Sequence, residues 1–198
     1  MPTLTSVRGT EPWRRRLFLP AYNVADAARY AGTSPQNVSN WHYRDLGYGA
    51  VLPGRERGKP LSYLELIEVA VVAVFRSLGV SLETIGKTRD YAAQHLGSEY
   101  PFVEFEFKTD GHRMLMEFSQ FEPDFDPRRV IVADAGGQLG WEHMMAERFA
   151  QFDYEYNLAM VWHVAGRNSL VRIDPRIAFG APIVGGIPTW VLKGRWKA

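Results

Sequence analysis

The strongest constraint on the fold of this 198-residue chain is a pair of short helical patterns on either side of Gly32. Asn23 is a good N-cap, and small alanines then recur at helical spacing as far as Ala31. Gly32 lets the chain leave a helix with a positive φ, and Ser34 followed by Pro35 is typical of a helix start. The pattern predicts two short helices that pack closely around a tight turn.

The second of these helices carries side chains suited to contacting DNA bases. Gln and Asn bond adenine edges bidentately, and Ser contacts bases or phosphates. We therefore predict a helix-turn-helix, with the alternative that the polar side chains are merely solvated. Val38 and Trp41 are expected to face inward. The side chains expected to face outward and to contact DNA are Gln36, Asn37, Ser39, Asn40 and His42, followed by Arg44 on a phosphate.

A Gly- and Pro-rich connection leads from Gly47 to Pro60. It contains Arg55, Arg57 and Lys59, and it predicts a short β-wing whose basic tip meets the phosphate backbone.

Two further helices are expected after this connection. Ser62 and Glu65 form a capping box, and Ser81 opens the second helix. The first helix is predicted to have one apolar face, made of Leu64, Ile67, Val71, Val74 and Leu78. The predicted core positions of the second are Leu82, Ile85, Ala92 and Leu96.

Residues 22–96 resemble the MerR-type winged helix-turn-helix. The matching segments are Ala27-Ala28, Gly32, Ser34-Pro35, Val38, Trp41, the passage from Gly58 to Leu66, and residues 78–85. The resemblance implies double-stranded DNA binding, with helix 35–43 in the major groove and the wing on the backbone. The sequence departs from the family in having Lys59-Pro60-Leu61 at the end of the wing and no long heptad helix after Leu96.

The middle of the chain predicts a small α+β module. We expect a hairpin over residues 101–118 around an Asp-Gly turn, strands at 130–133, 158–164 and 170–173, and a helix over 141–152. The pairs Glu104/Glu106 and Asp124/Asp126 have the chemistry of a Mg²⁺ site or an acid–base pair. Solvent-face patterning explains them better, so we expect no metal, no cofactor and no enzymatic activity.

Residues 173–192 resemble a small helical domain of bacterial antitoxin-like proteins. The resemblance rests on Asp174-Pro175, Gly180, Pro182, Gly186 and the approach from Pro188 to Val191. Thr189 is a candidate N-cap for a final helix. Further helices follow in that family, so the module is expected to be incomplete. Ile187, Trp190 and Val191 would then be poorly covered and available to a partner.

Together the two resemblances point to the larger VapB-type antitoxins of type II toxin–antitoxin systems. They imply a homodimer that binds its operator DNA and neutralises a PIN-domain ribonuclease toxin. The residues expected to contact the toxin are Arg172, Arg176, Trp190 and Arg195, because a guanidinium pairs well with an acidic active site. The alternative that these arginines are solvated or bind DNA stays open.

Composition narrows the remaining function classes. The absence of cysteine excludes disulfides, thiolate metal sites and a cysteine nucleophile, and it suits a reducing cytoplasm. The longest apolar run, Val69–Phe75, is too short to span a membrane, and no signal-peptide pattern opens the chain. The net charge of +1 hides an acidic stretch, residues 98–165, between two basic ones.

We therefore predict four segments: an arm (1–21), a DNA-binding domain (22–98), an acidic α+β module (99–165) and a basic tail (166–198). An alternative function is a one-component regulator that senses a small ligand. Its pocket would be lined by aromatic residues of the middle module, namely Phe102, Phe105, Tyr154, Tyr156 and Trp162.

Overall fold

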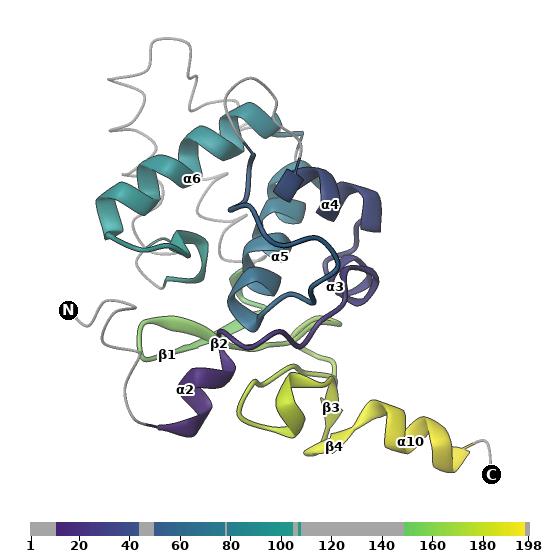
Figure 1. The fold of residues 1–198 in the computed structure, drawn as a ribbon. Helices are drawn as coiled ribbons and strands as arrows, with labels where there is room; N and C mark the ends of the chain where they lie inside the picture. Colours follow the sequence, from purple (N-terminus) through teal and green to yellow (C-terminus); the bar gives the residue numbers. More distant parts are fainter. Residues whose placement is uncertain (1–10, 44–49, 78, 105–106, 108–148, 197–198) are drawn as a thin grey trace.

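The fold is mixed α+β, as predicted. The computed structural model describes residues 11–43, 50–77, 79–104, 107 and 149–196. The helices are α2 (Pro12–Arg16), α3 (Val24–Tyr30), α4 (Pro35–Tyr43), α5 (Tyr63–Ser77), α6 (Leu82–Leu96) and α10 (Thr189–Trp196), with 3-10 turns η1 (Pro101–Val103) and η2 (Ala178–Gly180). Two antiparallel hairpins pair β1 (Phe152–Glu155) with β2 (Leu158–Trp162) and β3 (Ile183–Val184) with β4 (Ile187–Pro188) (Figure 1).

Helices α3 and α4 form the predicted helix-turn-helix. The Asn23 side chain accepts a hydrogen bond from the Asp26 N–H at 2.8 Å and so caps α3. Gly32 has a φ of +67°, and the Ser34 hydroxyl accepts from the Asn37 N–H at 3.1 Å at the start of α4. Val38 is fully buried, which packs α4 against the rest of the molecule.

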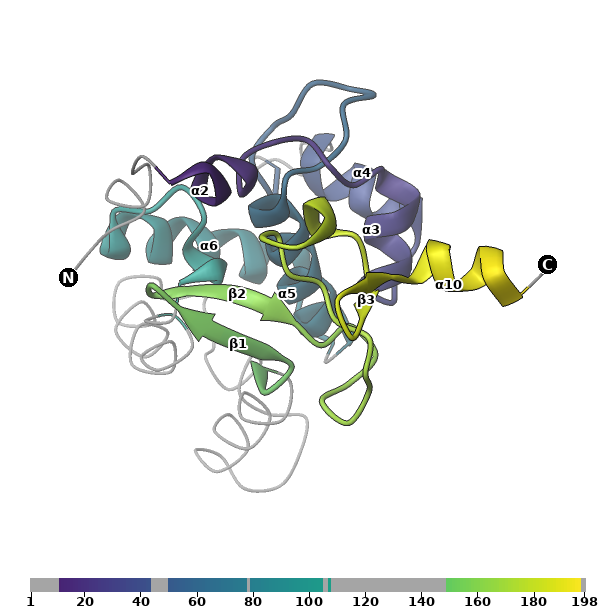
Figure 2. The same cartoon turned by 90° about the horizontal axis from the view of Figure 1, so that it is seen from below.

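Helix α5 lies at the centre of the molecule. Val69, Val72 and Phe75 are buried together with Leu64, Ile67 and Val71 of the predicted face, so the expectation of a single apolar face was too narrow. Val74 of that face is only partly buried, and Leu78 lies outside the described residues. The reason is visible in Figures 1 and 2, where α3 and α6 flank α5 and the β1–β2 hairpin passes beside it. A helix enclosed in this way has no side that requires polar residues.

A buried ion pair joins α5, α6 and η1. The Arg89 Nε donates to Glu68 Oε2 at 2.7 Å, and the Phe102 N–H donates to Glu68 Oε1 at 2.9 Å. Both side chains are buried. Burial raises the pKa of the Glu68 carboxyl, and the charge of Arg89 opposes that rise.

The predicted hairpin over 101–118 does not begin as a strand. Residues 101–103 form η1 instead, and Phe102 packs its ring against Phe75 and Phe107, with centroids 5.8 Å and 4.7 Å away. Pro101 favours this turn because it has no N–H to donate to a strand partner. Glu104 follows as an isolated bridge to Leu158. The rest of that hairpin, apart from Phe107, and the strand at 130–133 lie outside the described residues.

The later strand predictions are partly confirmed. The strand expected at 158–164 is present as β2, but residues 170–173 contribute only isolated bridges through Arg172 and Ile173. The helix predicted over 141–152 extends too far along the chain, because Phe152 is the first residue of β1. Residues 141–148 of that helix are outside the described part of the chain.

The hydrophobic core runs continuously across the predicted segment boundaries, from Leu17 to Ile173. Leu17 is fully buried, and the Trp13 ring stacks on Tyr156 at the β1–β2 turn with centroids 5.1 Å apart. Residues 11–21 are therefore built into the fold and do not form a separate arm.

Among the helices that the structure describes, none is both long enough and apolar enough to cross a membrane.

Candidate nucleic-acid interface

The solvent side of α4 presents a connected set of amide side chains. Gln36 and Asn37 are exposed, and Asn40 is partly exposed. The Gln36 Nε2 donates to Asn40 Oδ1 at 2.9 Å, and the Asn37 amide donates to the Thr33 hydroxyl at 3.1 Å. These bonds fix the side chains, while Gln36 Oε1 and Asn40 Nδ2 keep one acceptor and one donor group without a hydrogen bond among the described residues.

His42 does not belong to this exposed face, which corrects the prediction that it points outward. Its side chain is buried, and Nδ1 lies 2.8 Å from the Pro53 carbonyl oxygen. A carbonyl can only accept, so Nδ1 carries the hydrogen. Burial lowers the pKa of His42, with nearby Arg55 acting in the same direction. The residue holds the following loop against α4 and does not reach a DNA-facing surface.

Residues 50–60 form a loop that contains no strand, so the predicted β-wing is not formed as a hairpin. Pro53 and Pro60 remove two of the N–H groups that a ladder needs. The Leu52 N–H donates to the Trp41 carbonyl at 2.9 Å, and Leu61 pairs with Tyr22 as an isolated bridge. The loop therefore stays close to α4 without a partner strand.

The basic residues of this loop occupy three different environments. The Arg57 guanidinium lies over the Tyr43 ring, 5.2 Å from its centroid. Lys59 pairs with Glu56 on the loop itself. The Arg55 side chain is only 6% exposed, and its Nε lies 3.8 Å from Glu65 Oε1.

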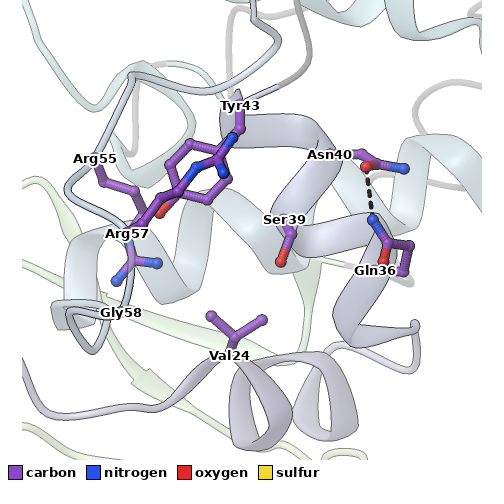
Figure 3. Close-up of a pocket in the computed structure, with 8 residues that line it drawn as sticks. All are labelled: Val24, Gln36, Ser39, Asn40, Tyr43, Arg55, Arg57 and Gly58. Carbon is purple, nitrogen blue, oxygen red and sulfur yellow. Dashed lines mark hydrogen bonds between the residues drawn. The ribbon is translucent and has the colours of Figure 1, made fainter.

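A hollow of about 350 Å³ separates α4 from loop 50–60, and we call it the α4–loop hollow (Figure 3). It is lined by Val24, Gln36, Ser39, Asn40, Tyr43, Arg55, Arg57 and Gly58. Among the described residues, the lining contains two cationic side chains and no acidic one, which favours an anion.

The structure thus brings together five of the residues predicted to contact DNA: Gln36, Ser39, Asn40, Arg55 and Arg57. Asn37 and Lys59 lie outside the lining, and Arg44 is outside the described residues. Tyr43 also lines the hollow but was not predicted from the sequence. Its position at the end of the predicted helix, close to a basic loop, could have indicated it.

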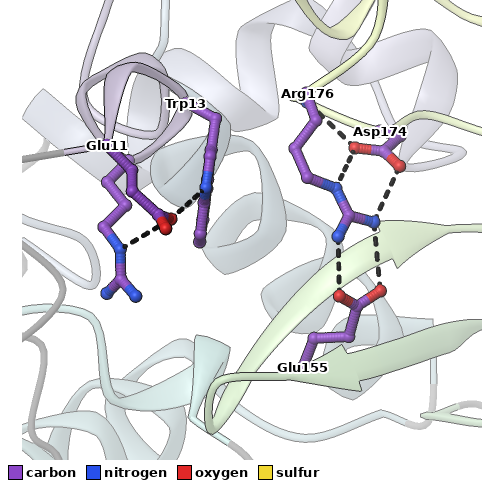
Figure 4. Close-up of polar contacts among 6 residues, drawn as sticks. Glu11, Trp13, Glu155, Asp174 and Arg176 are labelled. Carbon is purple, nitrogen blue, oxygen red and sulfur yellow. Dashed lines mark hydrogen bonds and ion pairs between the residues drawn. The ribbon is translucent and has the colours of Figure 1, made fainter.

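The predicted toxin-contacting residues of the basic tail lie in two kinds of environment. Arg176 forms a bidentate pair with Glu155, at 2.6 Å and 3.0 Å, and a further pair with Asp174 (Figure 4). Hydrogen bonds to these carboxylates raise the pKa of Arg176 further. Because its donors are engaged inside the molecule, Arg176 is not available to a partner, which corrects the prediction.

The other three predicted toxin-contacting residues are exposed. Trp190 is 69% exposed on α10, and Arg195 lies on the same helix. Arg172 and Arg195 make no ion pair among the described residues. Ile187 is 47% exposed, as expected for the tail.

The aromatic residues proposed for a ligand pocket do not converge. Phe102 belongs to the core, Tyr156 is exposed on the β1–β2 turn, and Phe105 is outside the described residues. Trp162 does line a hollow of about 270 Å³, together with Tyr30, Ala31, Gly32, Ala70, Ala73, Val74, Ser77, Gln151 and Phe152.

The carboxylates of the middle module give no support to a metal site. Glu104 is buried and accepts from the Ser98 hydroxyl and the Asn157 amide, each at 3.0 Å. Glu104 is therefore not on a solvent-exposed face. Its alternation with phenylalanine had predicted that it would be. The other three carboxylates of the two predicted pairs, Glu106, Asp124 and Asp126, lie outside the part of the chain that the structure describes. In the described ranges no group of three potential ligands could hold a metal ion.

The fold of the chain is similar to that of a protein whose crystal structure is known. No family model matches the chain, and no curated protein matches it. The chain is similar to the crystal structure of Rv2018 from Mycobacterium tuberculosis, with a TM-score of 0.75 and 21% sequence identity. The match covers 92% of this chain and 88% of Rv2018. The likeness is one of fold.

Proposed function

We propose that the chain binds duplex DNA through α4 and the α4–loop hollow, and that it does so as an antitoxin that represses its own operon. The observation that carries the DNA-binding half is the junction of an exposed amide face with a cationic hollow whose described lining residues include no acidic one. In this arrangement α4 enters the major groove and loop 50–60 follows the backbone.

Base contact belongs to the amide face of α4. Gln36 Oε1 and Asn40 Nδ2 supply an acceptor and a donor on adjacent turns of the helix. An adenine edge presents the complementary donor at N6 and acceptor at N7. The pre-formed bond between the two side chains lowers the entropy cost of orienting them.

The decisive experiment compares operator and random duplexes. Replacing Gln36, Asn37 and Asn40 by alanine should reduce the ratio of operator to random affinity by at least about tenfold, while salt-dependent binding to random DNA persists. Gln94→Ala on the exposed part of α6 is the matched amide control, and it should leave the ratio unchanged. An unaltered ratio in the triple variant would overturn the assignment of α4.

The antitoxin half of the proposal is supported by the resemblance of the tail and by the exposure of its terminal helix. Trp190 and Arg195 present an apolar ring and a guanidinium on α10. Such residues are enriched where binding energy concentrates in interfaces. The proposed partner is a PIN-domain ribonuclease with an acidic site.

The toxin proposal is tested by co-expression with a PIN-domain ribonuclease encoded beside this chain. Trp190→Ala combined with Arg195→Ala should weaken capture of the nuclease and restore its RNA cleavage. Arg167→Met, which removes an equal charge from the turn after β2, should leave inhibition intact. A nuclease that stays inhibited by the double variant would contradict the role of α10.

One observation favours a second candidate, a regulator that senses a small ligand. The 270 Å³ hollow lies directly behind the helix-turn-helix, because Tyr30 and Gly32 line it together with Trp162. A ligand there would contact the turn that positions α4. An apolar small molecule that protects Trp162 from quenching and changes operator affinity would support this alternative.

A further inference from the structure

The guanidinium of Arg55 is buried, and some of its N–H groups lack a hydrogen-bond acceptor among the described residues. Its side chain is 94% buried, and its ion pair with Glu65 Oε1 spans 3.8 Å. The Nε and Nη2 atoms are buried without a hydrogen-bond partner. A guanidinium has five N–H donors, and leaving buried donors unpaired costs free energy.

The groups around Arg55 describe the ligand that would satisfy it. Arg55 lines the α4–loop hollow, together with the exposed Arg57, the Ser39 hydroxyl and the Asn40 amide. Each of these can donate a hydrogen bond, and none of the lining residues that the structure describes is acidic. A guanidinium fork matches a tetrahedral oxyanion with two parallel hydrogen bonds.

We propose that the α4–loop hollow is a phosphate-binding site in which Arg55 turns from Glu65 to the phosphate. The phosphate is either a backbone phosphodiester of a duplex or a free phosphate, and the inference rests on the proposed function only for the first source. Arg57, released from the Tyr43 ring, reaches the same group from the solvent side.

The remainder of the fold permits this movement of Arg55. Glu65 has a second function, because its Oε2 accepts from the Ser62 N–H at 2.6 Å and caps α5. That bond does not involve Arg55, so α5 keeps its cap when the ion pair opens. Gly58, which lines the hollow, has no neighbouring atom within 4 Å of the place that a Cβ would take.

The first test uses the wild-type chain and inorganic phosphate. The ¹⁵N–¹H signal of the Arg55 Nε should shift and saturate with phosphate, and it should not respond to chloride at the same ionic strength. The melting temperature should rise with phosphate in the wild type and not in Arg55→Met. An Arg55 signal that phosphate leaves in place, with equal thermal shifts in both proteins, overturns a free-phosphate site.

The second test measures duplex affinity over a range of salt concentrations. Arg55→Met should weaken binding about tenfold and reduce the slope of log K against log salt by about 1, whereas Arg167→Met should leave the slope unchanged. Arg55→Lys keeps the charge but loses the fork, so it should recover only part of the affinity. If Arg55→Met does not fold, the lysine variant and the wild-type titration decide the question.

The two tests separate the inference from the DNA-binding proposal. Phosphate binding at Arg55 without any duplex binding would leave a free-phosphate site and remove the DNA proposal. Duplex binding that is unaffected by Arg55→Met or Arg55→Lys, with no phosphate response, would remove the phosphate site and leave the DNA proposal standing.

Discussion

At the scale of single residues, the Glu68–Arg89 pair shows how much of the fold depends on one buried charge contact. Glu68 is on α5, Arg89 is on α6, and the carboxylate also holds the N–H of Phe102 in η1. Removing one partner leaves the other charged and desolvated. Removing one partner therefore lowers the free energy of unfolding by much more than the intact pair raises it relative to a hydrophobic pair of similar volume.

Arg89→Leu should therefore destabilise the protein by about 3 kcal/mol at pH 8, as measured by urea unfolding. Without Arg89 the folded-state pKa of Glu68 rises further above its unfolded value, because burial is no longer opposed. The loss should shrink as the pH falls through the raised folded-state pKa of Glu68, because the carboxyl then binds a proton and no longer buries an unpaired charge. Arg29→Leu breaks an exposed pair with Asp26 and should cost less than about 1 kcal/mol at either pH. A pH-independent loss in Arg89→Leu would contradict this account.

At the same scale, the sequence predicted residues whose partners are close in the chain. Asn23, Ser34 and the Ser62–Glu65 box cap their helices as expected, because each bond spans three residues. Arg176 has one carboxylate partner close in the chain, Asp174, but its bidentate partner Glu155 is 21 residues away on a strand that the sequence did not predict, so the arginine was misassigned. His42 was misassigned for the same reason, since its partner is the backbone of a loop that follows α4.

At the scale of elements, the turn η2 joins the tail to the N-terminal half of the chain. Ala178, Phe179 and Gly180 all have positive φ values, and the Tyr22 hydroxyl donates to the Gly180 carbonyl at 2.9 Å. Two non-glycine residues in this region carry strain, which persists only where the surroundings enforce it. Tyr22 supplies part of that enforcement.

Gly180→Ala should destabilise the protein more than Gly166→Ala by at least about 2 kcal/mol in urea unfolding. Both glycines have a positive φ, so both variants incur backbone strain, but a Cβ at Gly180 would also overlap the Tyr22 hydroxyl. At Gly166 a Cβ would meet nothing within 4 Å. Tyr22→Phe should recover part of the loss in the Gly180 variant, and equal losses at the two glycines would contradict the contact as the cause.

Helices were easier to predict than the elements that assemble around them. The boundaries of α3, α4, α5 and α6 follow from caps and glycines in the sequence. Loop 50–60 was expected to be a β-wing because its composition suits a hairpin, but a strand needs a partner that composition does not supply. The residues of the α4–loop hollow were mostly predicted, whereas their grouping required the folded loop.

At the scale of the whole molecule, the N-terminal residues behave as part of the core. Leu17 is fully buried, and its carbonyl accepts from the Leu64 N–H at 3.3 Å at the start of α5. The Arg16 guanidinium donates to the Arg176 carbonyl at 3.1 Å, so α2 also contacts the tail. The predicted boundary after residue 21 was placed where the first helical pattern begins, and the later two boundaries follow shifts in charge. Neither signal reports how the interior is shared.

Leu17→Ala should lower the free energy of unfolding by about 3 kcal/mol, because it opens a cavity in the shared core. Leu19→Ala removes the same atoms from a side chain that is 54% exposed, and it should change stability by less than about 0.5 kcal/mol. Circular dichroism and tryptophan fluorescence should give coincident transitions in all three proteins. Separate transitions for the two probes would instead indicate independent modules.

The enclosure of α5 has a consequence for biosynthesis. A ribosome releases this chain from its N-terminus, so α3 to α6 emerge before β1 and β2. Until β2 and Ile173 have been made, apolar residues of α5 lack part of their native cover. Nascent chains with exposed apolar surface are the substrates of chaperones and proteases. The apolar residues of α5 are therefore fully covered only after the second half of the chain has been synthesised.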